Sequence, residues 1–173
     1  MPFVPTDSSS GEVYYQVANA NFRQGNDKAA LALINTMLEQ RKVYCYFEVK
    51  TLHAKMMHKL KKYTSAIKDC QDMLLANPPL KLRKEVTLYL ADSYSQSGNN
   101  KKAIATAWTI VPLTPKKLSP TEKAKIQKIL KLIYSCSKKI NSKIDQKEAK
   151  EIYKSMFPNS NILLYINSNL SNS

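Results

Sequence analysis

The sequence predicts an all-α protein built from repeated helical hairpins, a right-handed superhelical solenoid with capping helices at its C-terminal end. One observation is the segment KLKKYTSAIKDCQDMLLANPP, from Lys59 to Pro79, which has apolar residues at helical spacing between a turn and a proline stop. A second is that two other segments, GNDKAALALINTMLE and GNNKKAIATAWTIVP, carry small and apolar residues in the same order. Their alanines Ala30, Ala66 and Ala103 are 36 and 37 residues apart.

A third observation is a second set of small residues, which lies ahead of the first at a constant distance. Ala18, Ala54 and Ala91 each precede the alanine of their own segment by 12 residues. Two antiparallel helices can approach closely only where neither carries a bulky side chain at the crossing. The repeating unit is therefore predicted to be a pair of packed helices joined by a turn.

The segment KKYTSAIKDCQDMLLANP resembles the tetratricopeptide repeat family, whose unit is a helix–turn–helix of roughly 34 residues with small residues, a turn glycine and a terminal proline. The likeness extends from Glu12 to about Val111, and Tyr14, Lys50 and Thr87 stand where the family has an early tryptophan. The resemblance implies a stack of three such repeats that works by binding a protein partner.

Four parts are predicted along the chain. Residues 1–10 form a flexible N-terminus, 11–115 three hairpins, 116–158 a basic fourth hairpin that caps the stack, and 159–173 an Asn/Ser-rich tail. The fourth hairpin is predicted because Ser119, Pro120 and Glu122 have the pattern of a capping box before a long amphipathic helix. Ser137 also precedes Ala149 by 12 residues, as the alanines do in the other hairpins.

Composition argues against several classes of protein. Only three glycines occur, without the spacing of a phosphate-binding loop, and no serine or cysteine has a nucleophile motif around it. His53 and His58 lie about 140° apart around a helix, so they cannot chelate one metal. We therefore expect no enzyme, no cofactor and no metal.

The location of the protein is predicted from apolar runs and cysteine spacing. No stretch of about 18 apolar residues occurs, which predicts no membrane span. Cys45, Cys70 and Cys136 are an odd set without CxxC spacing, as expected for reduced thiols. We expect a soluble cytoplasmic protein, with a nuclear or organellar location as the open alternative.

The candidate binding site is the inner face of the first helix in each hairpin. Aromatic and cationic residues share that face, a mixture that suits an extended peptide with acidic and apolar side chains. This face predicts an adaptor or scaffold subunit of a larger complex, although for any one residue a solvated helix face is an equal alternative. Glutamates that recur near the helix starts, Glu12, Glu48 and Glu85, are assigned to the helix dipole and to capping. The groove candidates are Tyr15, Asn19, Phe22, Arg23, Lys55, His58 and Lys59.

The positive charge is concentrated in the fourth hairpin. Lys116 to Lys154 hold twelve lysines against four acidic residues, +8 of the formal net charge of +14. This distribution supports an alternative function, a basic solenoid associated with RNA in a ribonucleoprotein or organellar assembly. A solvated basic face is the simpler interpretation. A loose stripe opposite the apolar face of the long helix consists of Lys125, Lys128, Lys131, Lys138 and Lys139.

Overall fold

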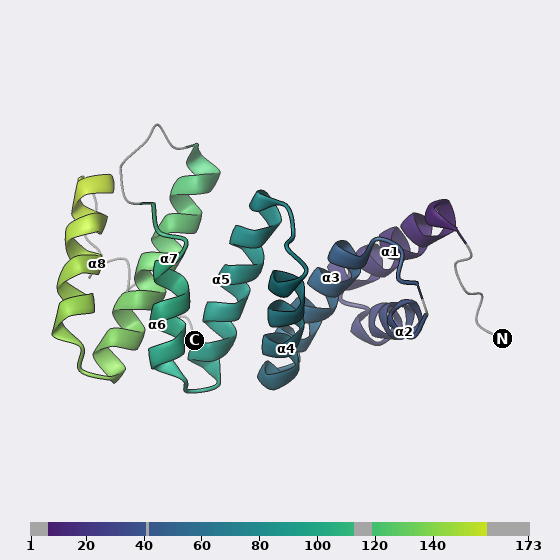
Figure 1. Cartoon of the computed structure of the whole chain (residues 1–173), viewed down its shortest axis with the longest axis horizontal. Coiled ribbons are helices and arrows are strands. Elements are labelled where there is room, and N and C mark those ends of the chain that lie inside the picture. The colour runs from purple at the N-terminus through teal and green to yellow at the C-terminus, as the bar shows by residue number, and fades with distance from the viewer. Residues whose placement is uncertain (1–6, 41, 113–118, 159–173) are drawn as a thin grey trace. The chain divides into compact units, whose positions relative to one another are not determined.

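The computed structural model describes residues 7–40, 42–112 and 119–158. Within these ranges the chain forms eight α-helices and no strand (Figure 1). The helices are α1 (Ser8–Arg23), α2 (Asp27–Leu38), α3 (Tyr46–Lys59), α4 (Tyr63–Leu75), α5 (Leu80–Gln96), α6 (Asn100–Trp108), α7 (Pro120–Lys139) and α8 (Lys143–Met156). None of these helices is both long enough and apolar enough to cross a bilayer.

The chain divides into two compact units. The N-terminal unit comprises Met1–Ser93 and the C-terminal unit Tyr94–Ser173, so the division falls inside α5. The predicted boundary between the three hairpins and the basic fourth hairpin, after residue 115, stays a prediction. We therefore describe the two units separately.

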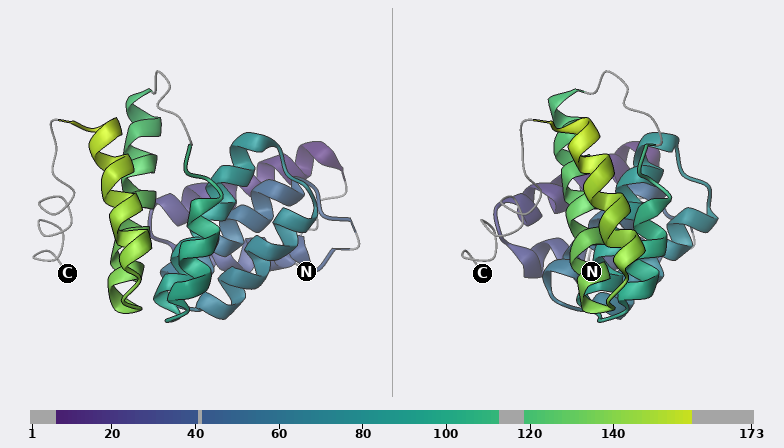
Figure 2. Two further views of the ribbon diagram at one scale, coloured as in Figure 1. Left: turned by 60° about the vertical axis from the view of Figure 1, so that its left-hand side comes forward. Right: turned by 90° about the vertical axis from the view of Figure 1, so that its left-hand side faces the viewer.

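Consecutive helices pack against each other within each unit. In the N-terminal unit α1 packs on α2 and α3 on α4, and α2 also packs on α3. In the C-terminal unit α7 packs on both α6 and α8, and Figure 2 shows α7 and α8 side by side. The all-α class and the sequential packing of helical hairpins are therefore confirmed, whereas the right-handed superhelix stays a prediction.

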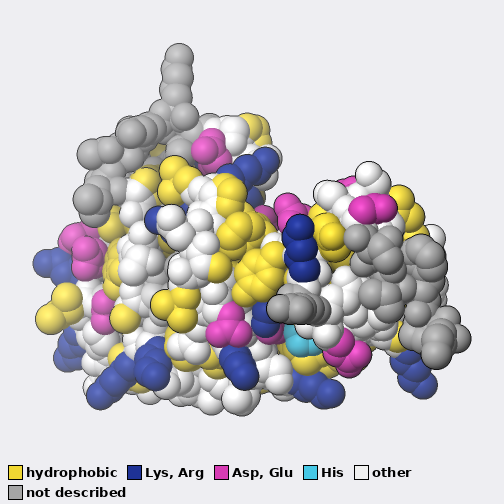
Figure 3. All heavy atoms as spheres, turned by 45° about the vertical axis from the view of Figure 1, so that its right-hand side comes forward, with side chains coloured by type: hydrophobic (Ala, Val, Ile, Leu, Met, Phe, Trp, Pro, Cys, Tyr) yellow, Lys and Arg dark blue, Asp and Glu magenta, His cyan; other side chains and the backbone are white. Residues whose placement is uncertain are grey.

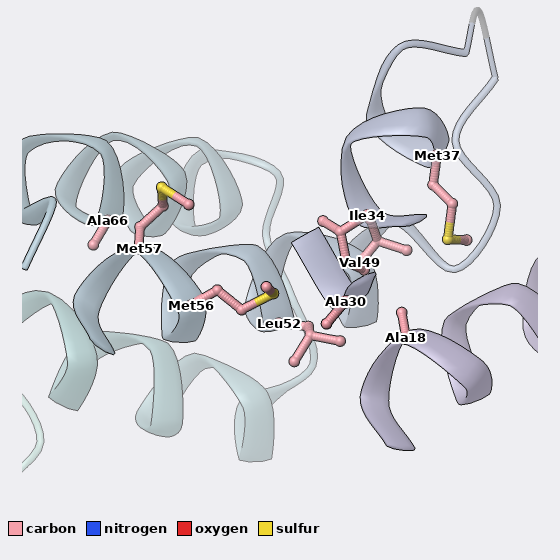
Figure 4. Packing of buried hydrophobic residues seen from close by; sticks show 9 residues of the cluster. All are labelled: Ala18, Ala30, Ile34, Met37, Val49, Leu52, Met56, Met57 and Ala66. Atoms are coloured by element: carbon pink, nitrogen blue, oxygen red, sulfur yellow. The ribbon is translucent and has the colours of Figure 1, made fainter. Parts of the chain in front are cut away.

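Small residues occupy the predicted helix crossings. Ala18, Ala30, Ala54 and Ala66 are all at most 2% exposed, and Figure 4 shows Ala18 and Ala30 near each other between the larger apolar side chains. In the C-terminal unit Ser137 and Ala149 are likewise fully buried. The core around the N-terminal crossings is filled by Ile34, Met37, Val49, Leu52, Met56 and Met57.

The four hairpin turns have the same backbone conformation. In each turn one residue has a left-handed φ, and the next N–H donates to the carbonyl oxygen five residues earlier, which is the Schellman arrangement at a helix C-terminus. The left-handed residues are Gly25 (φ 81°), Lys61 (58°), Gly98 (84°) and Asn141 (56°). The corresponding hydrogen bonds are Asn26 to Asn21 (2.9 Å), Lys62 to Met57 (2.8 Å), Asn99 to Tyr94 (2.8 Å) and Ser142 to Ser137 (2.9 Å). The fourth hairpin thus uses the turn of the first three.

We expect Lys61→Gly to raise the free energy of unfolding by about 0.5–1 kcal/mol, because glycine adopts a left-handed φ without the steric cost that a β-carbon imposes. Lys61 is exposed, so its side chain contributes little packing. The measurement is urea denaturation followed by circular dichroism. The control is Lys68→Gly on the exposed side of α4, which should lower the same free energy by about 1 kcal/mol. Destabilisation by Lys61→Gly would contradict the turn geometry.

Helix α1 begins inside the segment that was predicted to be flexible. Asp7 caps it, since its Oδ1 accepts a hydrogen bond of 2.7 Å from the backbone N–H of Ser10. Further along α1, Gly11 is buried against Tyr44, and a β-carbon at Gly11 would lie only 2.4 Å from the Tyr44 Cβ. Residues 1–6 and the predicted tail, 159–173, lie outside the described residues.

Candidate functional site

The predicted groove residues lie on α1 and α3, and the structure adds three residues of α5. All of them belong to the N-terminal unit, and α1, α3 and α5 are the first helices of the three successive hairpins. We call this set the α1–α3–α5 surface. It consists of Tyr15, Asn19, Phe22, Arg23, Lys55, His58, Lys59, Glu85, Tyr89 and Asp92.

Lys55 connects the three helices of this surface. Its Nζ lies 2.7 Å from Glu85 Oε1 and 5.5 Å from the centre of the Tyr89 ring, both on α5. On α1, burial raises the pKa of the Tyr15 hydroxyl, and the nearby charge of Lys55 offsets part of that rise. Lys55 is therefore in contact with Glu85 and Tyr89 of α5, and its charge acts on Tyr15 of α1.

Lys59 makes a similar bridge at the other end of α1. Its Nζ lies 5.2 Å from the centre of the Phe22 ring, within the range of a cation–π interaction. The same Nζ is 2.7 Å from Asp27 Oδ1 at the start of α2. Phe22 and Lys59, which are both among the groove candidates, are therefore in contact. Asp27, which was not a candidate, is the acidic partner of Lys59.

His58 lies between α4 and α5 rather than beside the aromatic residues of α1. Its Nε2 atom is 3.1 Å from Asp92 Oδ2. This nitrogen atom is buried, and its geometry does not allow a hydrogen bond with that oxygen. The ring meets Tyr63 and Tyr89 edge-on, with centroid distances of 5.4 and 6.1 Å. His58 is therefore held by rings and a carboxylate of its own chain.

The α1–α3–α5 surface is balanced in charge. Lys55, Lys59 and His58 each lie within ion-pair distance of a carboxylate of the same chain. Arg23 is exposed, and no described acidic side chain lies within ion-pair distance of it; Asn19 is half-buried. In the face of the molecule shown in Figure 3, acidic, basic and hydrophobic side chains are intermixed. The surface therefore carries acidic groups in addition to the aromatic and cationic residues that the helix faces predicted.

A buried charged cluster between α3 and α4 was not predicted. Asp69 on α4 is 5% exposed, and its two carboxylate oxygens lie 2.8 Å from Lys50 Nζ and 2.5 Å from His53 Nδ1. Burial alone would raise the pKa of Asp69, but the hydrogen bonds with His53 and Lys50 outweigh it and hold this pKa below its ordinary value. The available signal was an aspartate on a helix face otherwise occupied by Ala66, Cys70 and Met73.

The residue that follows Asp69 in the sequence is a cysteine. The adjacent Cys70 is buried, and burial together with the charge of Asp69 raises the pKa of its thiol to about 12, so it carries its proton at neutral pH. Among the described residues no three His, Cys, Asp or Glu side chains are grouped as a metal ion would require. The hydrogen bonds of Asp69 with Lys50 and His53 join α4 to α3.

The predicted lysine stripe lies on α7, in the C-terminal unit. Lys125, Lys128, Lys138 and Lys139 are exposed, and Lys131 is half-buried. The opposite face of α7 buries Ile126, Ile129, Leu130 and Ile133. The stripe is therefore spread over the solvent side of the helix rather than drawn into a single line.

Comparison with known proteins assigns no family to this chain. The sequence matches no family model, and no curated protein is significantly similar to it. The likeness to tetratricopeptide repeats therefore depends on the spacing of the alanines and on the repeated turns.

Proposed function

We propose that the N-terminal unit is a non-catalytic protein-interaction module of tetratricopeptide type, which binds an extended segment of a partner on the α1–α3–α5 surface. The observation that carries this proposal is the set of partly exposed aromatic rings on α1 and α5, with lysines of α3 on the hairpin between them. Phe22 lies beside Lys59 and Tyr89 beside Lys55, and the charge of Lys55 also lowers the pKa of Tyr15 against the larger effect of burial. Aromatic side chains beside charged groups are typical of the residues that dominate binding energies. The protein would then serve as an adaptor or scaffold subunit of a larger complex.

The charge balance of the surface narrows the chemistry of the expected partner. Because Lys55 and Lys59 already pair with Glu85 and Asp27, a purely acidic peptide gains little from them. We expect a segment with apolar or aromatic side chains that cover the exposed rings, and one acidic group that reaches Arg23. The proposed compartment is the cytoplasm, since all three cysteines are free thiols.

We expect Phe22→Ala and Lys55→Glu to weaken partner binding at least tenfold. Phe22→Ala removes a ring that a partner would cover, and Lys55→Glu places two carboxylates, its own and that of Glu85, next to each other. The full chain is used as bait in a cell extract, and the amount of each co-purifying protein is compared between variants. Circular dichroism of each bait checks that its helical content is unchanged.

Two further variants separate a binding effect from a folding effect. Lys68→Glu makes the same charge change on the exposed side of α4 and should retain every partner. The exchange Lys55→Glu with Glu85→Lys restores an ion pair in the opposite direction, so it should restore stability but not binding. If Lys55→Glu and Phe22→Ala recover the same partners in the same amounts as the unchanged chain, the α1–α3–α5 surface is not the binding site.

A further inference from the structure

A row of lysines follows one flank of α8. Lys143, Lys147, Lys150 and Lys154 are spaced by four, three and four residues, which places them within about 60° around the helix. Lys143, Lys147 and Lys154 are exposed, and Lys150 is half-buried. This row lies beside the buried face that contains Ala149 and Tyr153.

The row on α8 continues onto α7. Lys150 Nζ lies 5.2 Å from the centre of the Tyr134 ring, so the lysine flank of α8 adjoins the Tyr134 side of α7. Lys131 and Lys138 lie three residues before and four residues after Tyr134, on that same side of α7. We call these six residues the α7–α8 lysine surface: Lys131, Lys138, Lys143, Lys147, Lys150 and Lys154. Figure 2 shows the two helices that carry it side by side.

Three of the four acidic residues of this hairpin are engaged elsewhere or lie at the edge, and the fourth, exposed Glu148, lies about 100° around α8 from Lys147. Asp145 accepts hydrogen bonds from Trp108 Nε1 on α6, at 2.8 Å, and from Ser142 Oγ. Glu122 belongs to the capping box at the start of α7. Glu151 lies 3.9 Å from Lys147, and both side chains are largely exposed. The C-terminal unit has 14 lysines and four acidic residues, so it carries +10 of the net charge of +14.

We propose that the α7–α8 lysine surface binds the phosphodiester backbone of a nucleic acid, independently of the peptide-binding role of the N-terminal unit. Lysine presents a compact point charge that suits phosphates, whereas recognition of carboxylates favours the planar fork of arginine. Anchoring to an anionic lipid surface is strengthened by apolar side chains that insert, and the strongly exposed apolar side chain of α8, Ile144, lies about 100° around the helix from Lys143, outside the lysine surface. Tyr134 is 5% exposed and cannot stack on a base, so binding is independent of sequence.

The test measures fluorescence anisotropy of a labelled single-stranded RNA of mixed sequence, about 20 nucleotides long, with the full chain. The surface variant carries Lys143→Gln, Lys147→Gln and Lys154→Gln, and leaves Lys150 on its aromatic ring. The matched control carries Lys28→Gln, Lys68→Gln and Lys81→Gln, three exposed lysines of the N-terminal unit, and therefore has the same net charge. We expect at least tenfold weaker binding for the surface variant only, and a salt slope about two units shallower in log K against log[salt].

Further ligands identify the source of the phosphates. Duplex RNA and duplex DNA of the same length distinguish the kind of nucleic acid, and preferential binding of any of the three supports the proposal. The proposal is overturned if the unchanged chain binds none of them at 50 mM salt, or if the control loses as much affinity as the surface variant. It is also overturned if phosphatidylserine vesicles or polyglutamate bind more tightly than every nucleic acid and depend on the same three lysines.

Discussion

Ala66→Trp is expected to unfold the N-terminal unit. Ala66 is 1% exposed at the contact between α3 and α4, and Figure 4 shows it close to Met57. An indole cannot enter this crossing without separating the two helices, and overpacking on that scale costs more than about 3 kcal/mol. Since small domains have only about 5–15 kcal/mol in total, we expect a large fall in the thermal midpoint and a broadened transition. The measurement is circular dichroism during heating.

The neighbouring residue provides the control. Ser65 is exposed on the same helix, so Ser65→Trp should change the free energy of unfolding by no more than about 0.5 kcal/mol. An unchanged midpoint for Ala66→Trp would remove the packed-hairpin interpretation of the alanine spacing. A large loss in both variants would show that α4, rather than its crossing with α3, is sensitive to tryptophan.

The fold was predictable because a helix crossing constrains residue size at both of its sides. Only small side chains permit close approach of two helices. Buried small residues 12 positions apart occur in the first three hairpins and again at Ser137 and Ala149. The turns were less visible in the sequence. Gly25 and Gly98 mark two of them, but Lys61 and Asn141 adopt the same left-handed conformation without a glycine.

The charge of the candidate surface could not be predicted from single helix faces. The faces grouped aromatic with cationic residues, and one such pair, Phe22 with Lys59, is in contact. They did not show that Glu85 would pair with Lys55, and this glutamate was assigned to helix capping. Helix α5 in fact begins at Leu80, so Glu85 lies in its second turn and its side chain reaches the preceding hairpin. The periodicity of apolar residues in one helix does not show which of its side chains will contact which side chains of another helix.

The largest omission was the buried cluster of Lys50, His53 and Asp69. Each helix alone shows only a charged residue near an apolar face, which is ordinary at a helix border. The cluster forms because α3 and α4 are antiparallel and close, so that residues 16 and 19 positions apart meet. Because Asp69 is buried and is shared by Lys50 and His53, its removal should change the free energy of unfolding.

We expect Asp69→Ala to lower the free energy of unfolding by about 2 kcal/mol, because it leaves Lys50 and His53 without their shared carboxylate. The side chain of Lys50 is 17% exposed and retains some access to water, which keeps the loss below that of a fully buried ion pair. The control is Asp72→Ala, whose carboxylate is 39% exposed and 3.5 Å from Lys50, with an expected loss below about 0.5 kcal/mol. Equal losses in the two variants would show that the Asp69 cluster does not stabilise the α3–α4 contact.

The contribution of this cluster should also depend on pH in a defined direction. The pKa of Asp69 is lower in the folded protein, so its contribution is present above about pH 4 and is lost as the pH falls through the folded value. Burial works to lower the pKa of Lys50, but the hydrogen bond and the charges of Asp69 and Asp72 raise it overall. The contribution of Lys50 is therefore present at neutral pH and is lost only above about pH 10. The difference in unfolding free energy between the unchanged chain and Asp69→Ala, measured by urea denaturation, should shrink as the pH falls below about 4. A difference that grows on acidification would reverse the sign assigned to Asp69.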